Sequence, residues 1–190
     1  MKKIIVTAAA SALALAAPAA AQSASILIVD SERVLNDCTA CKSASAQLVA
    51  KQNALRTRAA TLRTQLQTEG KPLQDAVNAL NGKDPDAALK AKIVAFQTKE
   101  KNANQEMETA GNQLQSTAAN VQQQIGQKLV AVVEQVRARR GAAIVLSKNS
   151  TIANDNAIDV TADVLTALNT QLPAVSVTPL PAGAQAQPSR

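Results

Sequence analysis

The sequence predicts a mainly α-helical fold in which a long antiparallel helical hairpin projects from a small oligomeric body that contains β-strands. Apolar residues recur with heptad spacing through residues 42–140, as in a coiled coil. The segment Asn81-Gly82-Lys83-Asp84-Pro85 interrupts this stretch with turn residues, and short β-branched runs flank it on both sides. Residues 42–140 are therefore expected to form the hairpin arm, and 22–41 with 141–172 the body.

The first 21 residues have the layout of a secretory signal peptide. A basic start, Met1-Lys2-Lys3, precedes an apolar run over 4–17, and small residues end at Ala21. A membrane anchor is the alternative, but the run is shorter than the roughly 20 residues that span a bilayer. The mature protein is expected to begin at Gln22 and to be exported.

Each expected arm carries two apolar rows. On the first arm they are Leu48, Leu55 and Leu62, and Ala59, Leu66, Leu73 and Leu80; on the second they are Leu89, Phe96, Ala103 and Ala110, and Ile93, Met107, Leu114 and Val121. At the turn, Gly82 suits the left-handed end of the first helix, and Asp84 is expected to cap the second. Proline inside a helix removes a hydrogen bond, so Gly70-Lys71-Pro72 predicts a kink. Alanine and polar residues in the rows indicate pliable arms.

The body is expected to begin with a buried strand, Ile26-Leu27-Ile28-Val29, followed by a helix that Asp30-Ser31 can cap. Gly141 ends the second arm, and the apolar run 142–146 predicts another strand. Residues 151–153 are a plausible hairpin partner for it.

A closing helix is expected from an N-cap at Thr161 to Leu172. From Pro173 to the end, the Pro-, Ala- and Gln-rich sequence has no periodicity, which is typical of a disordered tail over 173–190.

Such a body is too small to be stable alone, since domains below about 40 residues usually need disulfides, metals or oligomerisation. Association through the strands would close the sheet edges. The residues expected to be buried between subunits are Ile26, Ile28, Ile144 and Leu146.

The formal net charge is +6, and the positive charge is concentrated in the arms. Residues 42–101 contain eleven Lys or Arg and five acidic residues. A basic surface attracts nucleic acid, anionic membrane or acidic polypeptide, although a solvated helix face is the plain alternative. Export and a single aromatic residue, Phe96, argue against nucleic acid, because bases would have nothing on which to stack.

No enzymatic chemistry is indicated. The sequence has no histidine, which excludes histidine-based catalysis and histidine-ligated metal sites, and no cofactor motif stands out. Asp84 and Asp86 are explained by helix capping. Cys38 and Cys41 are expected to form a local disulfide in an oxidising compartment; a reduced or intersubunit pair and a redox-active pair are the alternatives.

These features together resemble the Skp/OmpH family of periplasmic chaperones for outer-membrane proteins. The resemblance extends to about Leu172 and rests on the Ile26-Leu27-Ile28-Val29-Asp30 opening, the Ala- and Gln-rich hairpin, the 142–146 strand and Ile158-Asp159-Val160-Thr161-Ala162-Asp163-Val164-Leu165. It implies a periplasmic homotrimer with a β-barrel-like body and three arms, which holds unfolded outer-membrane β-barrel chains in a cavity without ATP. The cysteine pair and the Pro-rich tail depart from the family pattern. Contact with anionic membrane or lipopolysaccharide is left open.

In such a chaperone, broad and flexible surfaces suit a client that must not be held in one register. The apolar residues expected to contact clients are Leu48, Leu55, Leu62, Leu66, Leu73, Val77, Leu89, Ile93 and Phe96. The basic residues expected to attract acidic client segments are Lys51, Arg56, Arg58, Arg63, Lys71, Lys83, Lys90 and Lys92. A structural periplasmic adaptor and a thiol–disulfide protein are the rival interpretations.

Overall fold

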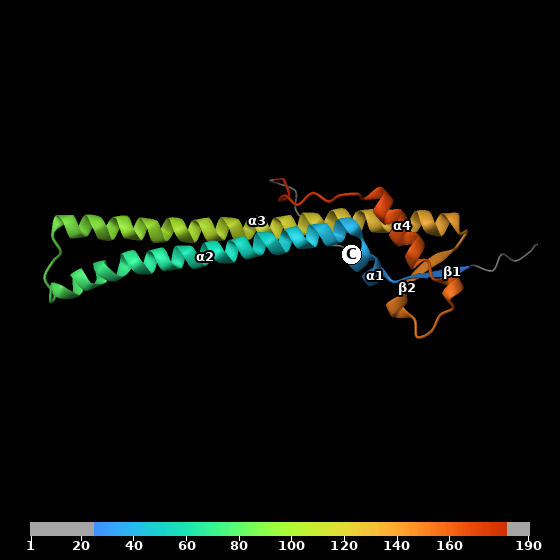
Figure 1. Ribbon diagram of the computed structural model, residues 1–190, viewed down its shortest axis with the longest axis horizontal. Coiled ribbons are helices and arrows are strands. Elements are labelled where there is room, and N and C mark those ends of the chain that lie inside the picture. The colour runs from blue at the N-terminus through green and yellow to red at the C-terminus, as the bar shows by residue number, and fades with distance from the viewer. Residues whose placement is uncertain (1–24, 182–190) are drawn as a thin grey trace, which may run out of the picture.

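The computed structural model describes residues 25–181, and the expected signal peptide lies outside the described residues. The elements are, in chain order, β1 (Ile26–Val29), α1 (Ser31–Asp37), α2 (Thr39–Ala79), α3 (Ala87–Arg139), β2 (Ile144–Ser147), two 3-10 turns (Lys148–Ser150 and Asn156–Ile158) and α4 (Thr161–Gln171). Figure 1 shows α2 and α3 side by side, projecting from a small body that holds the other elements.

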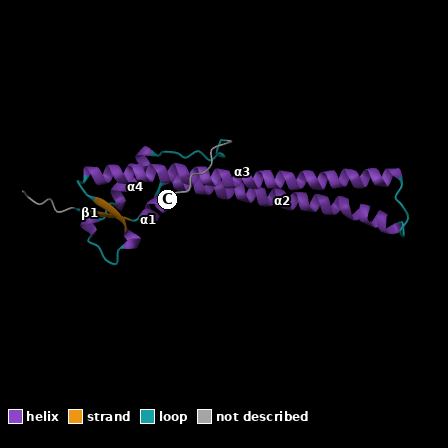
Figure 2. Ribbon diagram, turned by 180° about the vertical axis from the view of Figure 1, so that it is seen from behind, coloured by secondary structure: helices purple, strands orange, loops and turns teal. Residues whose placement is uncertain are grey.

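The two long helices run in opposite directions. Two ion pairs join them along their length, Arg58 with Glu106 and Lys99 with Glu69. Half-buried positions recur along both helices at the expected heptad spacing, which places the apolar rows between them. The helices lie furthest apart toward the tip, as Figures 1 and 2 show.

Gly70 lies where the ring of Phe96 meets α2. A Cβ atom at position 70 would stand 2.8 Å from Cζ of Phe96, closer than van der Waals contact allows. The glycine therefore makes room for the only aromatic side chain of the protein. Pro72 does not end the helix, which continues to Ala79.

The tip of the arm turns as expected but begins α3 later than expected. Asn81 and Gly82 both have positive φ, at 49° and 85°. The N-cap of α3 is Asp86, whose Oδ1 accepts a hydrogen bond of 2.7 Å from the amide of Leu89, so the expectation of Asp84 was wrong. A start after Asp86 gives the first turn alanine and leucine in place of proline and aspartate, which are poorer helix formers.

In the body, β1 pairs with β2 in parallel, with Ile26 opposite Ile144. The whole arm forms the connection between these two strands. The expected strand at 151–153 is absent: Thr151 donates through both its amide and its hydroxyl to the carbonyl of Lys148, which closes a 3-10 turn. The second neighbour of β1 is instead a bridge from Ile28 to Asp159.

The apolar core lies at the base of the arms. Its fully buried side chains come from α1 (Val34), α3 (Val132, Val136) and α4 (Val164, Leu168). Leu27 and Val29 of β1 and Cys38, Ala40 and Ala44 at the start of the first arm complete one face. The core therefore joins segments that lie more than a hundred residues apart.

A polar cluster fastens β1 to the start of α4. Thr161 was expected to be the N-cap of α4, but it is the first helical residue, because its hydroxyl accepts a hydrogen bond of 2.9 Å from the amide of Asp30. Its own amide donates to Oδ1 of Asp159, and Nζ of Lys148 donates to Oδ2 of the same carboxylate at 2.8 Å. Burial opposes ionisation of Asp159, but these hydrogen bonds outweigh it and lower the pKa of its carboxyl to about 2.

Residues 173–181, which were expected to be disordered, lie against α3 in an extended conformation (Figures 1 and 2). Their main chain is hydrogen-bonded to side chains of Ser116, Asn120 and Gln124. Val175 and Val177 pack against the apolar core. A composition that is poor for helix or sheet is thus compatible with an ordered segment, because α3 supplies its hydrogen-bond partners. We call residues 173–181 the strap.

The cap at the arm tip generates a first prediction. Asp86→Ala should lower the free energy of unfolding by about 1 kcal/mol, because the amide of Leu89 loses its acceptor. Asp84→Ala, two residues earlier, is the matched control and should change it by less than about 0.5 kcal/mol. Chemical denaturation followed by circular dichroism measures both. Equal losses in the two variants would contradict the assignment of the cap.

The lowered pKa of Asp159 generates a second prediction. A carboxyl whose pKa is lowered on folding adds stability above its unfolded value, 3.8, and that stability is lost as the pH falls toward 2. Asp159→Asn should therefore destabilise the protein by about 1–2 kcal/mol at pH 7. The difference from the wild type should shrink between about pH 4 and pH 2. Chemical denaturation at several pH values measures the difference in free energy of unfolding, and Glu108→Gln, at an exposed position, is the control. A difference that does not change with pH would contradict the lowered pKa of Asp159.

Candidate functional site

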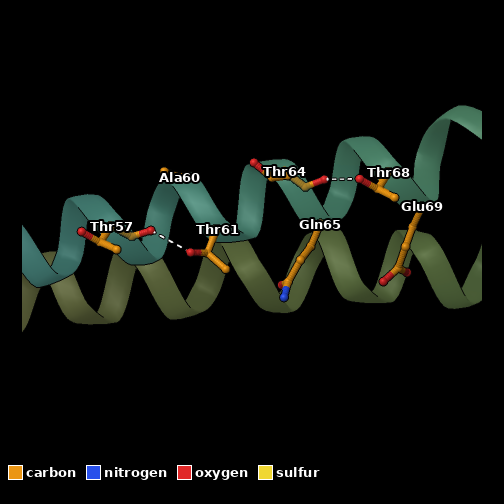
Figure 3. A pocket seen from close by; sticks show the side chains of 7 residues that line it. All are labelled: Thr57, Ala60, Thr61, Thr64, Gln65, Thr68 and Glu69. Atoms are coloured by element: carbon orange, nitrogen blue, oxygen red, sulfur yellow. Dashed lines mark hydrogen bonds between the residues drawn. The ribbon is translucent and has the colours of Figure 1, made fainter.

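The exposed face of α2 carries a shallow groove in the middle of the arm, with one charged residue, Glu69, in its lining. It has a volume of about 520 Å³ and is lined by one helix only, through Thr57, Ala60, Thr61, Thr64, Gln65, Thr68 and Glu69. Figure 3 shows these side chains along a single face. The four threonines recur at i, i+4, i+7 and i+11, which is the spacing of one helix face. We call this surface the threonine face.

The hydroxyl groups on the threonine face are partly satisfied within the helix. The hydroxyl of Thr61 donates to the carbonyl of Thr57 at 3.0 Å, and that of Thr68 donates to the carbonyl of Thr64 at 2.9 Å (Figure 3). A hydroxyl that bonds to its own helix leaves the methyl group of the side chain for an outside contact. The face is therefore weakly apolar and has little need of a polar partner.

Most of the apolar residues expected to contact clients lie in the contact between α2 and α3. The half-buried members are Leu48, Leu55, Leu62, Leu66, Leu73, Leu89, Ile93 and Phe96. Val77 is more exposed than these. Within one chain these side chains hold α2 and α3 together. They can contact a client only where the two helices separate. The threonine face is exposed without such a change.

The basic residues divide into two groups. Arg58 binds the carboxylate of Glu106 through two hydrogen bonds, of 2.6 and 2.9 Å, and Lys71 pairs with Asp75. The hydrogen bonds from Arg58 lower the pKa of Glu106 and raise the pKa of Arg58 itself. The basic residues that form no ion pair with the described part of the chain are Lys51, Arg56, Arg63, Lys83, Lys90 and Lys92. These six are available to an acidic partner.

The four strand residues expected at a subunit interface differ in exposure. Ile26 is 46% exposed and Ile144 is 45% exposed, and they lie opposite each other in the sheet. Leu146 is half-buried, whereas Ile28 is buried inside its own chain. The burial of Ile28 therefore needs no second subunit, because β1 lies between β2 and the bridge at Asp159.

Cys38 and Cys41 form a disulfide at the junction of α1 and α2. Both residues are buried in the core, and Sγ of Cys38 accepts a hydrogen bond from the amide of Cys41 as the N-cap of α2. The amide of Thr39 donates to Oδ1 of Asn169, which ties this junction to α4. The disulfide thus lies where a structural staple would act, and its burial leaves little access for an exchange partner.

The described residues offer neither a cluster of metal ligands nor a membrane-spanning helix. Among the residues that the structure describes, no group of three or more His, Cys, Asp or Glu side chains could hold a metal ion. No described helix combines the length and the apolar character that crossing a membrane requires.

The threonine face and the strap were missed from the sequence. The threonines at i, i+4, i+7 and i+11 have the spacing of one helix face. Threonine is neither charged nor strongly apolar, so it adds nothing to a heptad pattern of apolar residues. The strap partners, Ser116, Asn120 and Gln124, also recur every four residues. Their spacing was a usable signal, but nothing local connected them to a segment more than fifty residues later.

Comparison with known proteins agrees with this architecture. The family model described as "Outer membrane protein (OmpH-like)" matches residues 25–168. The crystal structure of a candidate outer membrane chaperone (OmpH-like) from Caulobacter crescentus CB15 superposes with a TM-score of 0.67 at 19% identity, covering 81% of this chain and 89% of that one. No curated protein matches the sequence. The family match spans the body and the arm, so the resemblance seen in the sequence is confirmed: the chain belongs to the OmpH-like family of outer membrane proteins.

Proposed function

We propose that this protein is an ATP-independent periplasmic holdase, which captures unfolded outer-membrane β-barrel proteins between the arms of a homotrimer and prevents their aggregation. The observation that carries this proposal is a long arm whose exposed face is shallow, rich in threonine and weakly apolar, in a chain of the OmpH-like family. An unfolded client has many registers, and a surface without a deep pocket accommodates them equally.

Charge supports a two-stage capture. Arg56 and Arg63 lie in the same stretch of α2 as the threonine face and have no acidic partner among the described residues. Their field steers acidic client segments to the arm, and it acts over about 10 Å at 0.1 M salt. Weak contacts with threonine methyl groups then hold the client, so neither stage needs an energy source.

Exposed strand residues support the assembly. Within residues 25–181 the sheet has two strands, and Ile26 and Ile144 present an apolar pair at its surface. An unprotected strand edge with apolar side chains favours pairing with another chain. Three copies that pair through the free edge of β2 and bury Ile26 and Ile144 would close into a barrel-like body and point three arms around one cavity.

The proposal is tested by light scattering from a denatured outer-membrane β-barrel protein diluted into buffer without ATP. The wild type is expected to suppress aggregation when present in stoichiometric amounts. Arg56→Gln/Arg63→Gln should slow capture severalfold in stopped-flow mixing at low salt, and the gap should close as salt is raised. Arg33→Gln/Lys42→Gln removes the same charge at the body, where both residues pair with Asp37, and should change the rate little. Aggregation that proceeds unchanged with the wild type would refute the proposal.

The assembly is tested separately. Ile144→Asp should dissociate the oligomer, because a carboxylate buried without a partner costs several kcal/mol. Val94→Asp is the control, since Val94 is also apolar and exposed, at 61%, but lies in the arm. Sedimentation velocity measures both. If the Ile144→Asp protein sediments like the wild type, the interface lies elsewhere.

A further inference from the structure

The contact between the strap and α3 has a regular pattern. Gln124 forms a pair of 3.0 Å hydrogen bonds with the main chain of Ser176, one through each end of its amide group. Nδ2 of Asn120 donates to the carbonyl of Thr178, and Oγ of Ser116 accepts from the amide of Leu180, both at 3.0 Å. We call Ser116, Asn120 and Gln124 the polar ladder. Every strap atom that it binds belongs to the main chain.

The spacing of the polar ladder matches an extended polypeptide. Its members are four residues apart on the helix, a rise of about 6.0 Å. Their partners are two residues apart on the strap, which in an extended chain is about 6.6 Å. The near equality of these repeats lets one helix face bind every second residue of any extended segment. The hydrogen bonds of the polar ladder go to the main chain of the strap and not to its side chains.

The strap side chains alternate in exposure over residues 175–178, and the alternation ends at Pro179, which is exposed, and Leu180, which is half-buried. Val175 and Val177 are half-buried and pack against the core, whereas Ser176 and Thr178 between them are exposed. A strand of a membrane β-barrel alternates apolar and polar residues with the same period of two. Residues 175–178 of the strap share this period of two.

The face also continues beyond the strap. The strap runs toward the arm tip, since Leu180 lies at Ser116 and Ser176 at Gln124. The next positions on this face toward the tip are Asn112, Thr109 and Gln105, which are uncharged, polar and exposed. A longer extended segment would find further partners of the same kind there.

We propose that the polar ladder is a docking site for the main chain of an extended client segment with alternating apolar residues, and that the strap is its resident competitor. This inference rests on the proposed holdase function and specifies how that function engages its client. A client must displace the strap at the base of the arm, and the strap closes the site again after release. Intramolecular competition of this kind weakens client binding without removing the site.

The test uses a fluorescent peptide with the sequence of residues 173–181 and the full chain carrying Ser176→Pro. Proline removes the amide that donates to Gln124 and so loosens the strap; Ser176→Ala keeps that amide and is the control. The peptide should bind the proline variant at least about fivefold more tightly than the wild type or the alanine variant. Adding Gln124→Ala should reverse the gain, whereas Gln122→Ala, which is exposed on another face of α3, should not.

Backbone methylation separates main-chain from side-chain recognition. A peptide N-methylated at the positions of Ser176 and Leu180 should lose binding about tenfold, because it lacks both bound amides. The same peptide methylated at Val175 and Val177 is the control and should keep most of its affinity. Equal losses in both peptides, or no binding to the loosened chain, would overturn the inference. If the proline variant melts early, Val175→Ser/Val177→Ser loosens the strap from its apolar side and serves the same comparisons.

Client capture by the same proteins distinguishes the two proposals. The proline variant should bind a denatured barrel protein more tightly than the wild type does, and free peptide should reduce that binding. Wild-type protein that suppresses aggregation while the loosened chain gains neither peptide nor client would refute the ladder and leave the holdase standing. Peptide binding that obeys the methylation rule without any client protection would refute the holdase and, with it, the client as occupant.

Discussion

The structure depends on the burial of a few valine and leucine side chains at the base of the arms. Val34, Val132 and Val164 come from three helices, and all are fully buried. Each apolar side chain of this size contributes roughly 1.5–3 kcal/mol when it is removed from water. The parallel pairing of β1 with β2 lies beside this core. It brings together the two ends of a connection that is more than a hundred residues long. The arms project because their ends are fixed there.

The arms themselves are held together more weakly. Their contact is half-buried along most of its length, and ion pairs such as Arg58 with Glu106 are exposed to water, where such pairs are worth about 0–1 kcal/mol. The ring of Phe96 on α3 packs against Gly70, which has no side chain to contribute to the contact. The base is therefore held together more firmly than the contact between α2 and α3.

Local patterns in the sequence were sufficient for the arms and for the first strand, because heptad spacing, the Asp30 cap and Gly141 act within a few residues of the structure they determine. The errors arose where a distant partner outweighed a local preference. Threonine is a common N-cap residue, but the hydroxyl of Thr161 accepts a hydrogen bond from the amide of Asp30, 131 residues earlier in the chain. The composition of the strap predicts disorder for the same reason: its hydrogen-bond partners lie on α3 and cannot be inferred from that composition.

The threonine face and the polar ladder both consist mainly of neutral polar side chains at helical spacing. They differ in the direction of their hydrogen bonds. On α2 the hydroxyls of Thr61 and Thr68 bond inward, so the surface offers methyl groups. On α3 the groups of the polar ladder bond outward, so the surface offers donors and acceptors to another main chain. An unfolded β-barrel chain presents both apolar side chains and unpaired peptide groups. A single net hydrogen bond is worth about 1 kcal/mol, so several in register can hold such a chain while each remains easy to exchange.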